Sequence, residues 1–147
     1  MQVTVVGGSS ADGQTLALAE SVGKAVAAKG GVLVCGGLGG VMEAAARGAK
    51  ETGGVTVGIL PTYNAESGNP YIDIAIPTGM GHGRNMLVVA SGDIVVALAG
   101  SHGTHCEVTY ALLLGRRVLG LKAWEHVPGV HPINSIEELE RELLPKF

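Results

Sequence analysis

Val32-Leu33-Val34-Cys35-Gly36-Gly37-Leu38-Gly39-Gly40 is an apolar run that passes directly into a cluster of glycines. The same succession occurs at three other places, with apolar runs and glycine-rich segments at 3–6 and 7–13, 71–76 and 79–83, and 93–98 and 100–103. In total, 24 of the 147 residues are glycine, against an average share of about 7%. Because the glycines follow apolar runs and have no fixed period, they indicate turns at strand ends, not a collagen-like or low-complexity chain.

Helical periodicity fills the stretches between these runs. For example, Leu16, Ala19, Val22 and Val26 recur at the spacing of one helix face. The predicted strands are residues 3–6, 32–35, 55–60, 71–76, 93–98 and 117–121, and the predicted helices are 14–29, 41–51, 84–91, 104–114 and 135–144. Strands that alternate with helices are typical of a parallel sheet with helices on both faces. We therefore predict an α/β fold: a single Rossmann-like, doubly wound domain over residues 1–147.

Local signals mark some element boundaries. Gly30 and Gly31 form a C-terminal stop for the first predicted helix. Ser135 and Glu138 have the spacing of a capping box at the start of the last. Residues 62–70 and 124–132 are rich in turn-forming residues and are predicted as loops, the first of them exposed.

Composition excludes several classes of protein. Hydrophobic residues make up 46% of the chain and charged residues only 16%, which is not the composition of a disordered chain. The formal net charge of −3, with no cluster of basic residues, argues against a nucleic-acid partner. No apolar run is long enough to cross a membrane, and the first residues lack the charged region of a signal peptide. We therefore predict a cytoplasmic protein with no membrane partner.

The four glycine-rich loops are expected to meet at one edge of the sheet. In an open parallel sheet, ligands bind outside the carboxyl ends of the strands, near the point where the strand order reverses. Glycine backbone approaches a ligand closely, and helix N-termini present free N–H groups to an anion. Any one loop is compatible with a purely structural turn, and neither a G-x-G-x-x-G nor a P-loop motif is present. The four loops together predict a cradle for a phosphorylated ligand.

Two charged residues lie beside these loops. Arg84 follows the glycine-rich segment at the start of a predicted helix, where a positive charge opposes the helix dipole. This favours a role in binding a phosphate or carboxylate over that of a solvated surface arginine. Thr104 and Glu107 have the spacing of a capping box, so Glu107 can cap the helix, face the ligand as a general acid or base or as a partner of sugar hydroxyls, or do both.

His102, His105 and Cys106 lie close together but match no standard zinc-binding spacing, and we predict no metal site. Cys106 has no identifiable base that would make it a nucleophile. Cys35 and Cys106 do not make a disulfide framework in a chain of this size, in keeping with a reducing compartment.

The motifs together resemble a known family. Gly36-Gly37-x-Gly39-Gly40-Val41-Met42-x-Ala44 is one half of the pattern. The other half consists of Arg84-Asn85, Ser91-x-Asp93 and Gly100-x-x-Gly103-Thr104-x-x-Glu107. Over nearly its whole length the chain is similar to the Rossmann-like superfamily long labelled "lysine decarboxylase-like". That superfamily includes the cytokinin-activating phosphoribohydrolases (the LOG proteins) and the molybdenum cofactor carrier proteins.

The resemblance implies roles for individual residues. In the phosphoribohydrolases, an arginine and the glutamate of a P-G-G-x-G-T-x-x-E motif cleave the N-glycosidic bond of a nucleoside monophosphate. This implies Arg84 and Glu107 as a catalytic pair. With the glycine loops included, the implied ligand- and phosphate-binding residues are Gly8, Ser9, Gly36, Gly37, Gly39, Gly40, Met42, Asn85, Gly100, Ser101, Gly103 and Thr104.

Two departures separate this chain from the hydrolases. The leading Pro-Gly of the motif is missing from Leu98-Ala99-Gly100-Ser101-His102-Gly103-Thr104, and Asn85 replaces the lysine that follows the arginine. The Arg84-Asn85 pair and the short chain are closer to the carrier branch, in which the same edge of the sheet binds an anionic, phosphorylated pterin without converting it. Lysine decarboxylation has little support, because no lysine is evident that would bind pyridoxal phosphate.

We therefore expect a binding protein or carrier for a phosphorylated nucleotide-like or pterin ligand. The bound compound would be a nucleoside monophosphate or a molybdopterin-type ligand, and no resident cofactor is required. The alternative is a nucleoside 5′-monophosphate phosphoribohydrolase. A third interpretation is a structural or sensing module gated by a nucleotide. By the resemblance we also expect a homodimer or a higher homo-oligomer.

Overall fold

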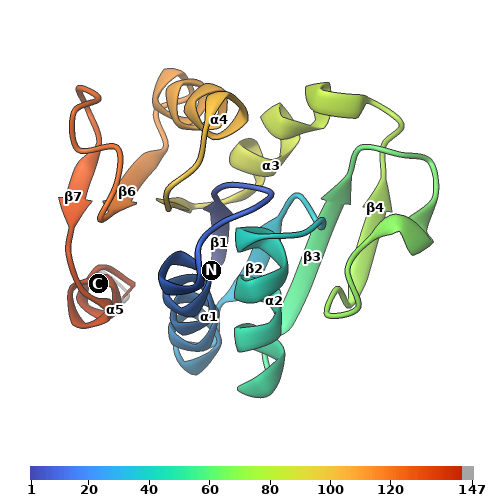
Figure 1. Ribbon diagram of the computed structural model, residues 1–147, viewed down its shortest axis with the longest axis horizontal. Helices are drawn as coiled ribbons and strands as arrows, with labels where there is room; N and C mark the ends of the chain where they lie inside the picture. The colour runs from blue at the N-terminus through green and yellow to red at the C-terminus, as the bar shows by residue number, and fades with distance from the viewer. Residues whose placement is uncertain (144–147) are drawn as a thin grey trace.

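Seven parallel strands form the centre of the protein. The computed structural model describes residues 1–143, and its strands follow the order β4-β3-β2-β1-β5-β6-β7 in one sheet (Figure 1). The strands are β1 (Gln2–Val6), β2 (Val32–Cys35), β3 (Val55–Leu60), β4 (Ile74–Pro77), β5 (Ile94–Ala97), β6 (Arg117–Leu121) and β7 (His131–Ile133). Every neighbouring pair is parallel, so the carboxyl ends of all the strands lie at one edge.

Helices cover both faces of this sheet. They are α1 (Gly13–Ala28), α2 (Val41–Glu51), α3 (Asn85–Ser91), α4 (His102–Leu113) and α5 (Ile136–Glu142), with short 3₁₀ helices at Ala65–Ser67 and Gly81–Arg84. Figure 1 shows α1, α2 and α5 below the sheet and α3 and α4 above it. The predicted Rossmann-like, doubly wound α/β fold is therefore confirmed. Within residues 1–143, no helix combines the length and the hydropathy needed to cross a membrane.

The central strand β1 separates two hydrophobic clusters. Val3 and Val5 belong to the cluster between the sheet and the helices α1 and α2. Val6 belongs to the cluster between the sheet and the helices α3 and α4. This alternation follows from the two-residue period of a strand. Thr4 is fully buried, and its hydroxyl donates a hydrogen bond of 2.7 Å to the carbonyl of Val88 in α3. Its polar atom is thus satisfied inside the core.

Two glycines let α1 and α2 pack backbone against backbone. A Cβ at Gly23 of α1 would lie 1.9 Å from the carbonyl oxygen of Ala45 in α2. A Cβ at Gly48 of α2 would lie 2.0 Å from the carbonyl oxygen of Glu20 in α1. This close approach sets the position of α2, whose N-terminus begins at the carboxyl edge of the sheet.

The strand order reverses at β1, which pairs with β2 on one side and β5 on the other. The chain leaves β1 toward α1 on one face and leaves β5 toward α4 on the opposite face. Because the two connections diverge, a crevice opens between them at the carboxyl edge, where open parallel sheets bind ligands.

The structure departs most from the predicted strands at two places: one strand begins later than predicted, and one strand was not predicted. The strand predicted at 71–76 begins only at Ile74, because Asp73 and the segment before it bond to Thr56 through side chains. The loop predicted at 124–132 runs into β7, an edge strand of three residues that pairs with β6. With a histidine and a proline in three residues, β7 has no apolar pattern to reveal it.

Helix boundaries also differ from prediction. The helix expected at 84–91 is divided at Arg84, which ends a 3₁₀ helix before α3 begins. The predicted start of α4 at residue 104 is two residues late. The capping box at Ser135 is present, since its side chain accepts a hydrogen bond from the Glu138 amide. Residue 144, the predicted end of the last helix, lies outside the described residues.

We predict that Gly23→Ala lowers the free energy of unfolding by about 1–3 kcal/mol, because the added methyl group overpacks the contact between α1 and α2. The matched control is Gly13→Ala at the start of the same helix, where a Cβ meets nothing within 4 Å. That variant should be neutral or more stable by about 0.4–1 kcal/mol. Urea denaturation of both variants measures the difference, and equal stabilities would contradict the close packing.

Candidate functional site

A cavity of about 350 Å³ opens at the carboxyl edge of the sheet, at the point where the strand order reverses. Its walls come from the loops after β1 and β2, from the 3₁₀ helix Gly81–Arg84 and the start of α3, and from the first two turns of α4. The structure thus brings together parts of the chain that are up to about a hundred residues apart. The sequence-predicted residues that line the cavity are Gly8, Ser9, Gly36, Met42, Arg84, Asn85, Ser101, Gly103, Thr104 and Glu107.

Backbone hydrogen bonds join the loops around the cavity. The Gly8 amide donates to the carbonyl of Ala99 at 2.9 Å, and the Gly8 carbonyl accepts from the Val41 amide at 3.0 Å. One residue therefore connects the loops that follow β1 and β5 to the N-terminus of α2. These bonds fix the relative positions of the loops before any ligand arrives, which limits the entropy lost on binding.

The loop after β2 is held from the other side by Asn69. Its backbone amide donates to the carbonyl of Gly37 at 2.8 Å, and its side-chain amide donates to the carbonyl of Leu38 at 2.9 Å. Asn69 also accepts a hydrogen bond of 3.0 Å from the amide of Tyr71. The segment before β4 therefore supports the cavity wall that contains Leu38.

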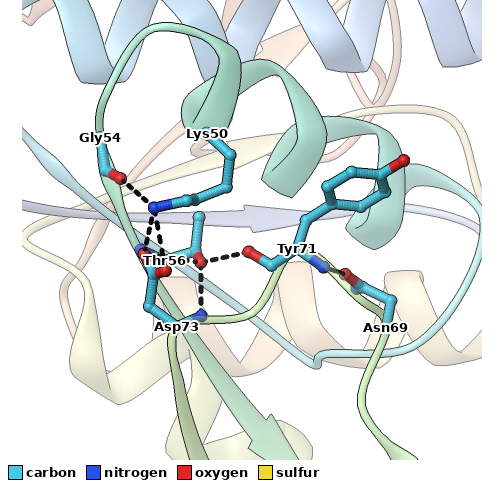
Figure 2. A network of polar contacts seen from close by, with 6 residues as sticks. All are labelled: Lys50, Gly54, Thr56, Asn69, Tyr71 and Asp73. Atoms are coloured by element: carbon cyan, nitrogen blue, oxygen red, sulfur yellow. Dashed lines mark hydrogen bonds and ion pairs between the residues drawn. The ribbon is translucent and has the colours of Figure 1, made fainter.

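A polar network anchors that segment to the base of β3 (Figure 2). The hydroxyl of Thr56 donates to the carbonyl of Tyr71, and the Asp73 amide donates to the same hydroxyl at 2.9 Å. Lys50, near the end of α2, forms an ion pair of 2.9 Å with Asp73 and donates to the carbonyl of Gly54. Burial acts to raise the pKa of Asp73, but hydrogen bonds from Lys50 and Thr56 outweigh it and lower that pKa.

Arg84 lies at the base of the cavity and is only 7% exposed. Its Nη2 donates a hydrogen bond of 3.3 Å to the carbonyl of Gly36, while its buried Nε has no hydrogen-bond partner within the described residues. A Cβ at Gly36 would lie 2.7 Å from Nη2, so the guanidinium needs a glycine beside it. Burial lowers the pKa of Arg84, and the nearby carboxylate of Glu107 opposes that shift.

Glu107 faces the same cavity from α4. Burial raises the pKa of its carboxyl to about 7, although the charge of Arg84 acts in the opposite direction. In the part of the chain that the structure describes, no ion pair within 4 Å joins the two side chains. Glu107 therefore changes its charge near neutral pH at a position where a ligand would meet it.

The capping box predicted for Thr104 and Glu107 is wrong. The N-cap of α4 is Ser101, so Thr104 and Glu107 both lie inside the helix. Thr104 is buried against Gly100, where a Cβ would lie 2.1 Å from its hydroxyl oxygen. The Ser101 side chain makes no capping hydrogen bond. The first backbone amides of α4 therefore stay available at the cavity wall.

Four of the predicted binding residues lie behind the cavity wall. Gly37 and Gly40 adopt left-handed backbone angles, and a Cβ at Gly40 would lie 2.3 Å from the carbonyl oxygen of Gly8. Gly39 lies over the backbone of Ser9, and Gly100 packs against Thr104. These glycines allow the loops to approach one another, and the cavity takes its shape from that approach.

The lining also contains residues that the sequence reasoning missed, namely Val5, Val6, Gly7, Leu38 and His82. His82 lies in the same 3₁₀ helix as Arg84, two residues before it. Its place in a glycine-rich segment that ends in a candidate anion-binding arginine was the available signal. Leu38 had a similar signal, because it is the one apolar residue enclosed by the glycines of segment 36–40.

Other parts of the chain offer fewer groups that could bind a ligand or react. A hollow of about 420 Å³ between α1 and the end of β6 is lined by Lys122 as its one charged residue. Among residues 1–143, no three histidine, cysteine or acidic side chains gather in a way that would hold a metal ion. Cys35 is completely buried, and burial raises the pKa of its thiol to about 11. Cys106 is exposed and unpaired with Cys35.

The chain is similar to a known family and to a known relative. The family model of the SLOG cluster4 family matches residues 1–143. A protein of Archaeoglobus fulgidus is 44% identical over 138 residues, which cover 94% of this chain and 91% of the relative.

Two solved structures share the fold over nearly the whole chain. The molybdenum cofactor binding protein of Rippkaea orientalis is 35% identical with a TM-score of 0.89, covering 97% of this chain and 96% of the other. The molybdenum cofactor carrier protein of Chlamydomonas reinhardtii is 30% identical with a TM-score of 0.88, covering 97% and 94%. These matches confirm the resemblance inferred from the motifs, including its carrier branch. The chain therefore belongs to the SLOG cluster4 family.

Proposed function

We propose that this protein is a binding protein or carrier for a phosphorylated, pterin- or nucleotide-like ligand that it holds intact in the cavity between β1 and β5. The observation that carries the proposal is Arg84. Its guanidinium is buried at the base of the cavity with one N–H group unpartnered in the described chain. Burying a cation is costly unless it meets an anion, and a ligand phosphate supplies one.

The rest of the lining suits such a ligand. The N-terminus of α4, with Ser101, Gly103 and Thr104 in the wall, offers amides and a partial positive charge to the same phosphate. The buried amide oxygen of Asn85 has no hydrogen-bond partner within the described residues and can accept from a ring N–H group. Leu38 and Met42 provide apolar contact for a planar ring.

The relatives support the carrier over other ligand-binding roles. Both the Rippkaea orientalis protein and the Chlamydomonas reinhardtii protein are described as binding or carrying the molybdenum cofactor. The cavity of about 350 Å³ lies within the size range of small-molecule sites. We infer that a molybdopterin-type compound is the preferred ligand and that a nucleoside monophosphate is a smaller substitute for it.

The phosphoribohydrolase alternative is favoured by one observation. Glu107, with a pKa of about 7, lines the same cavity as Arg84. A carboxyl group with this pKa suits general acid catalysis at neutral pH. In that case Glu107 would protonate the departing base while Arg84 held the phosphate.

The expected homodimer is part of the proposal. Met86 and Leu87 of α3, together with Leu113 and Leu114 at the end of α4, are exposed apolar side chains on the same face of the sheet. Exposed apolar side chains on one face are common at surfaces that associate.

We predict that Arg84→Met weakens binding of AMP and of molybdopterin by about 10- to 100-fold, the loss expected for a charge-assisted hydrogen bond. The matched control is Arg116→Met. Arg116 is partly buried, bonds to the carbonyl of Ala90 at 2.8 Å and, like Arg84, has a buried Nε with no partner in the described chain, but it does not line the cavity. Isothermal titration calorimetry measures both variants. Equal losses in the two would place the anion site elsewhere.

We predict that ligand affinity depends on the protonation of Glu107. The carboxyl has a pKa of about 7, so it is mostly neutral at about pH 6 and mostly charged at about pH 8, where it repels a phosphate. The ratio of the wild-type Kd to that of Glu107→Gln should therefore rise by up to about tenfold over this range. Using the ratio removes the titration of the ligand itself. A constant ratio would show that Glu107 does not face the anion.

We expect no free base or ribose 5-phosphate when the wild-type protein is incubated with AMP, because a carrier holds its ligand without conversion. Chromatography of the incubation mixture measures both products. Release that disappears in Glu107→Gln would overturn the carrier proposal and establish the hydrolase. A trace rate that is unchanged in that variant would indicate a contaminating enzyme.

A further inference from the structure

The loop between β5 and α4 is held at both ends by the side chain of Trp124. This loop, residues 98–101, contains Ser101 of the cavity wall and Ala99, whose carbonyl bonds to Gly8. We infer that Trp124 is a positioning residue, which fixes this loop in the shape that receives the ligand. The expected effect on ligand binding rests on the proposed function. The positioning of the loop rests on contacts of Trp124 that lie outside the cavity.

The first contact is a hydrogen bond at the start of the loop. The backbone ladder between β5 and β6 ends at the pair Ala97 and Gly120. The next carbonyl along β5, that of Leu98, accepts a hydrogen bond of 2.8 Å from the indole Nε1–H of Trp124. The indole thus extends the contact between the two strands by one residue, to the point where the loop begins.

The second contact lies at the other end of the loop. The ring of Trp124 stacks on His105, in the first turn of α4, with the ring centroids 5.3 Å apart and the planes 28° from parallel. The His105 amide donates to the carbonyl of Ser101 at 2.9 Å. The outer side of the indole meets His126 at 6.0 Å. One side chain therefore holds the first residue of the loop and the helical turn after it.

The backbone around Trp124 is unusual. Lys122 and Trp124 both have left-handed φ angles, of 53° and 65°, although neither is glycine. The chain turns back tightly here, since a Cβ at Gly120 would lie 2.3 Å from the carbonyl oxygen of Ala123. Non-glycine residues persist in this conformation where the surrounding contacts determine it, and they cluster at functional sites. The turn directs the indole to Leu98 and His105.

These contacts are connected to the cavity through the backbone. Leu98 precedes Ala99, which accepts from the Gly8 amide, and the Gly8 carbonyl accepts from Val41 at the start of α2. If the indole bond is lost, the loop gains freedom where it meets Gly8 and where Ser101 begins α4. The ligand would then have to order the loop itself, and its affinity would fall.

Trp124 is the one tryptophan of the chain, so its indole N–H gives a single resonance. We expect this proton to exchange with solvent at least about tenfold more slowly than that of free tryptophan, as a hydrogen-bonded group does. In Trp124→Phe, which keeps an aromatic ring against His105, the Gly8 amide should exchange about tenfold faster while amides of β2 keep their protection. AMP should bind that variant about tenfold more weakly.

Tyr110→Phe, two turns further along α4, is the matched aromatic control and should leave the Gly8 amide and AMP binding unchanged. Free exchange of the wild-type indole proton would overturn the inference, even if Trp124→Phe does not fold. An unchanged Gly8 amide in Trp124→Phe would also overturn it. If wild-type protein binds neither AMP nor molybdopterin, the proposed function fails, whereas the exchange measurements still decide whether Trp124 positions the loop.

Discussion

Gly8 is the residue on which the ligand-binding edge depends. Its amide bonds to the loop after β5 and its carbonyl bonds to the start of α2, so this one residue spans the point where the strand order reverses. Only a residue without a side chain fits there, because a Cβ at Gly8 would lie 2.6 Å from the carbonyl oxygen of Ser10. The loops would otherwise diverge to opposite faces of the sheet. The cavity is therefore formed by backbone contacts, and its side chains are placed on a wall that already exists.

Within that wall, the buried Arg84 and the half-buried Glu107 form no ion pair with each other in the described chain. Arg84 is almost inaccessible, and burial raises the pKa of Glu107 to about 7. Charged groups removed from water in this way make the folded state less stable than the same groups would if they were solvated. Functional sites commonly accept such a cost. In the proposed function, a ligand phosphate would compensate the arginine, and a protonated Glu107 would permit the phosphate to approach. The electrostatics of the cavity thus favour a bound anion.

The apolar strands were predictable because burial on both faces of a parallel sheet requires continuous apolar runs, as in β1 and β2. Helix stops were predictable from glycine. The strand β7 was not, since three edge residues leave no pattern. Arg84 was found through its conflict with the helix dipole, but the distinction between Gly36 and Gly40 was beyond sequence reasoning. Gly36 lines the cavity and Gly40 packs on the Gly8 loop, and each role is set by residues distant in the sequence. The same holds for Thr104 and Glu107, whose spacing suggested a cap although the helix begins at His102.

The central claim is that the cavity retains a phosphorylated ligand without converting it. The most direct measurement is to load the protein anaerobically with molybdopterin, remove unbound ligand by gel filtration, and identify by mass spectrometry what the protein releases on denaturation. The account predicts intact molybdopterin in a fixed molar ratio to the chain, and its loss in Arg84→Met. Protein that emerges without ligand, or that releases a cleaved fragment, would contradict the account.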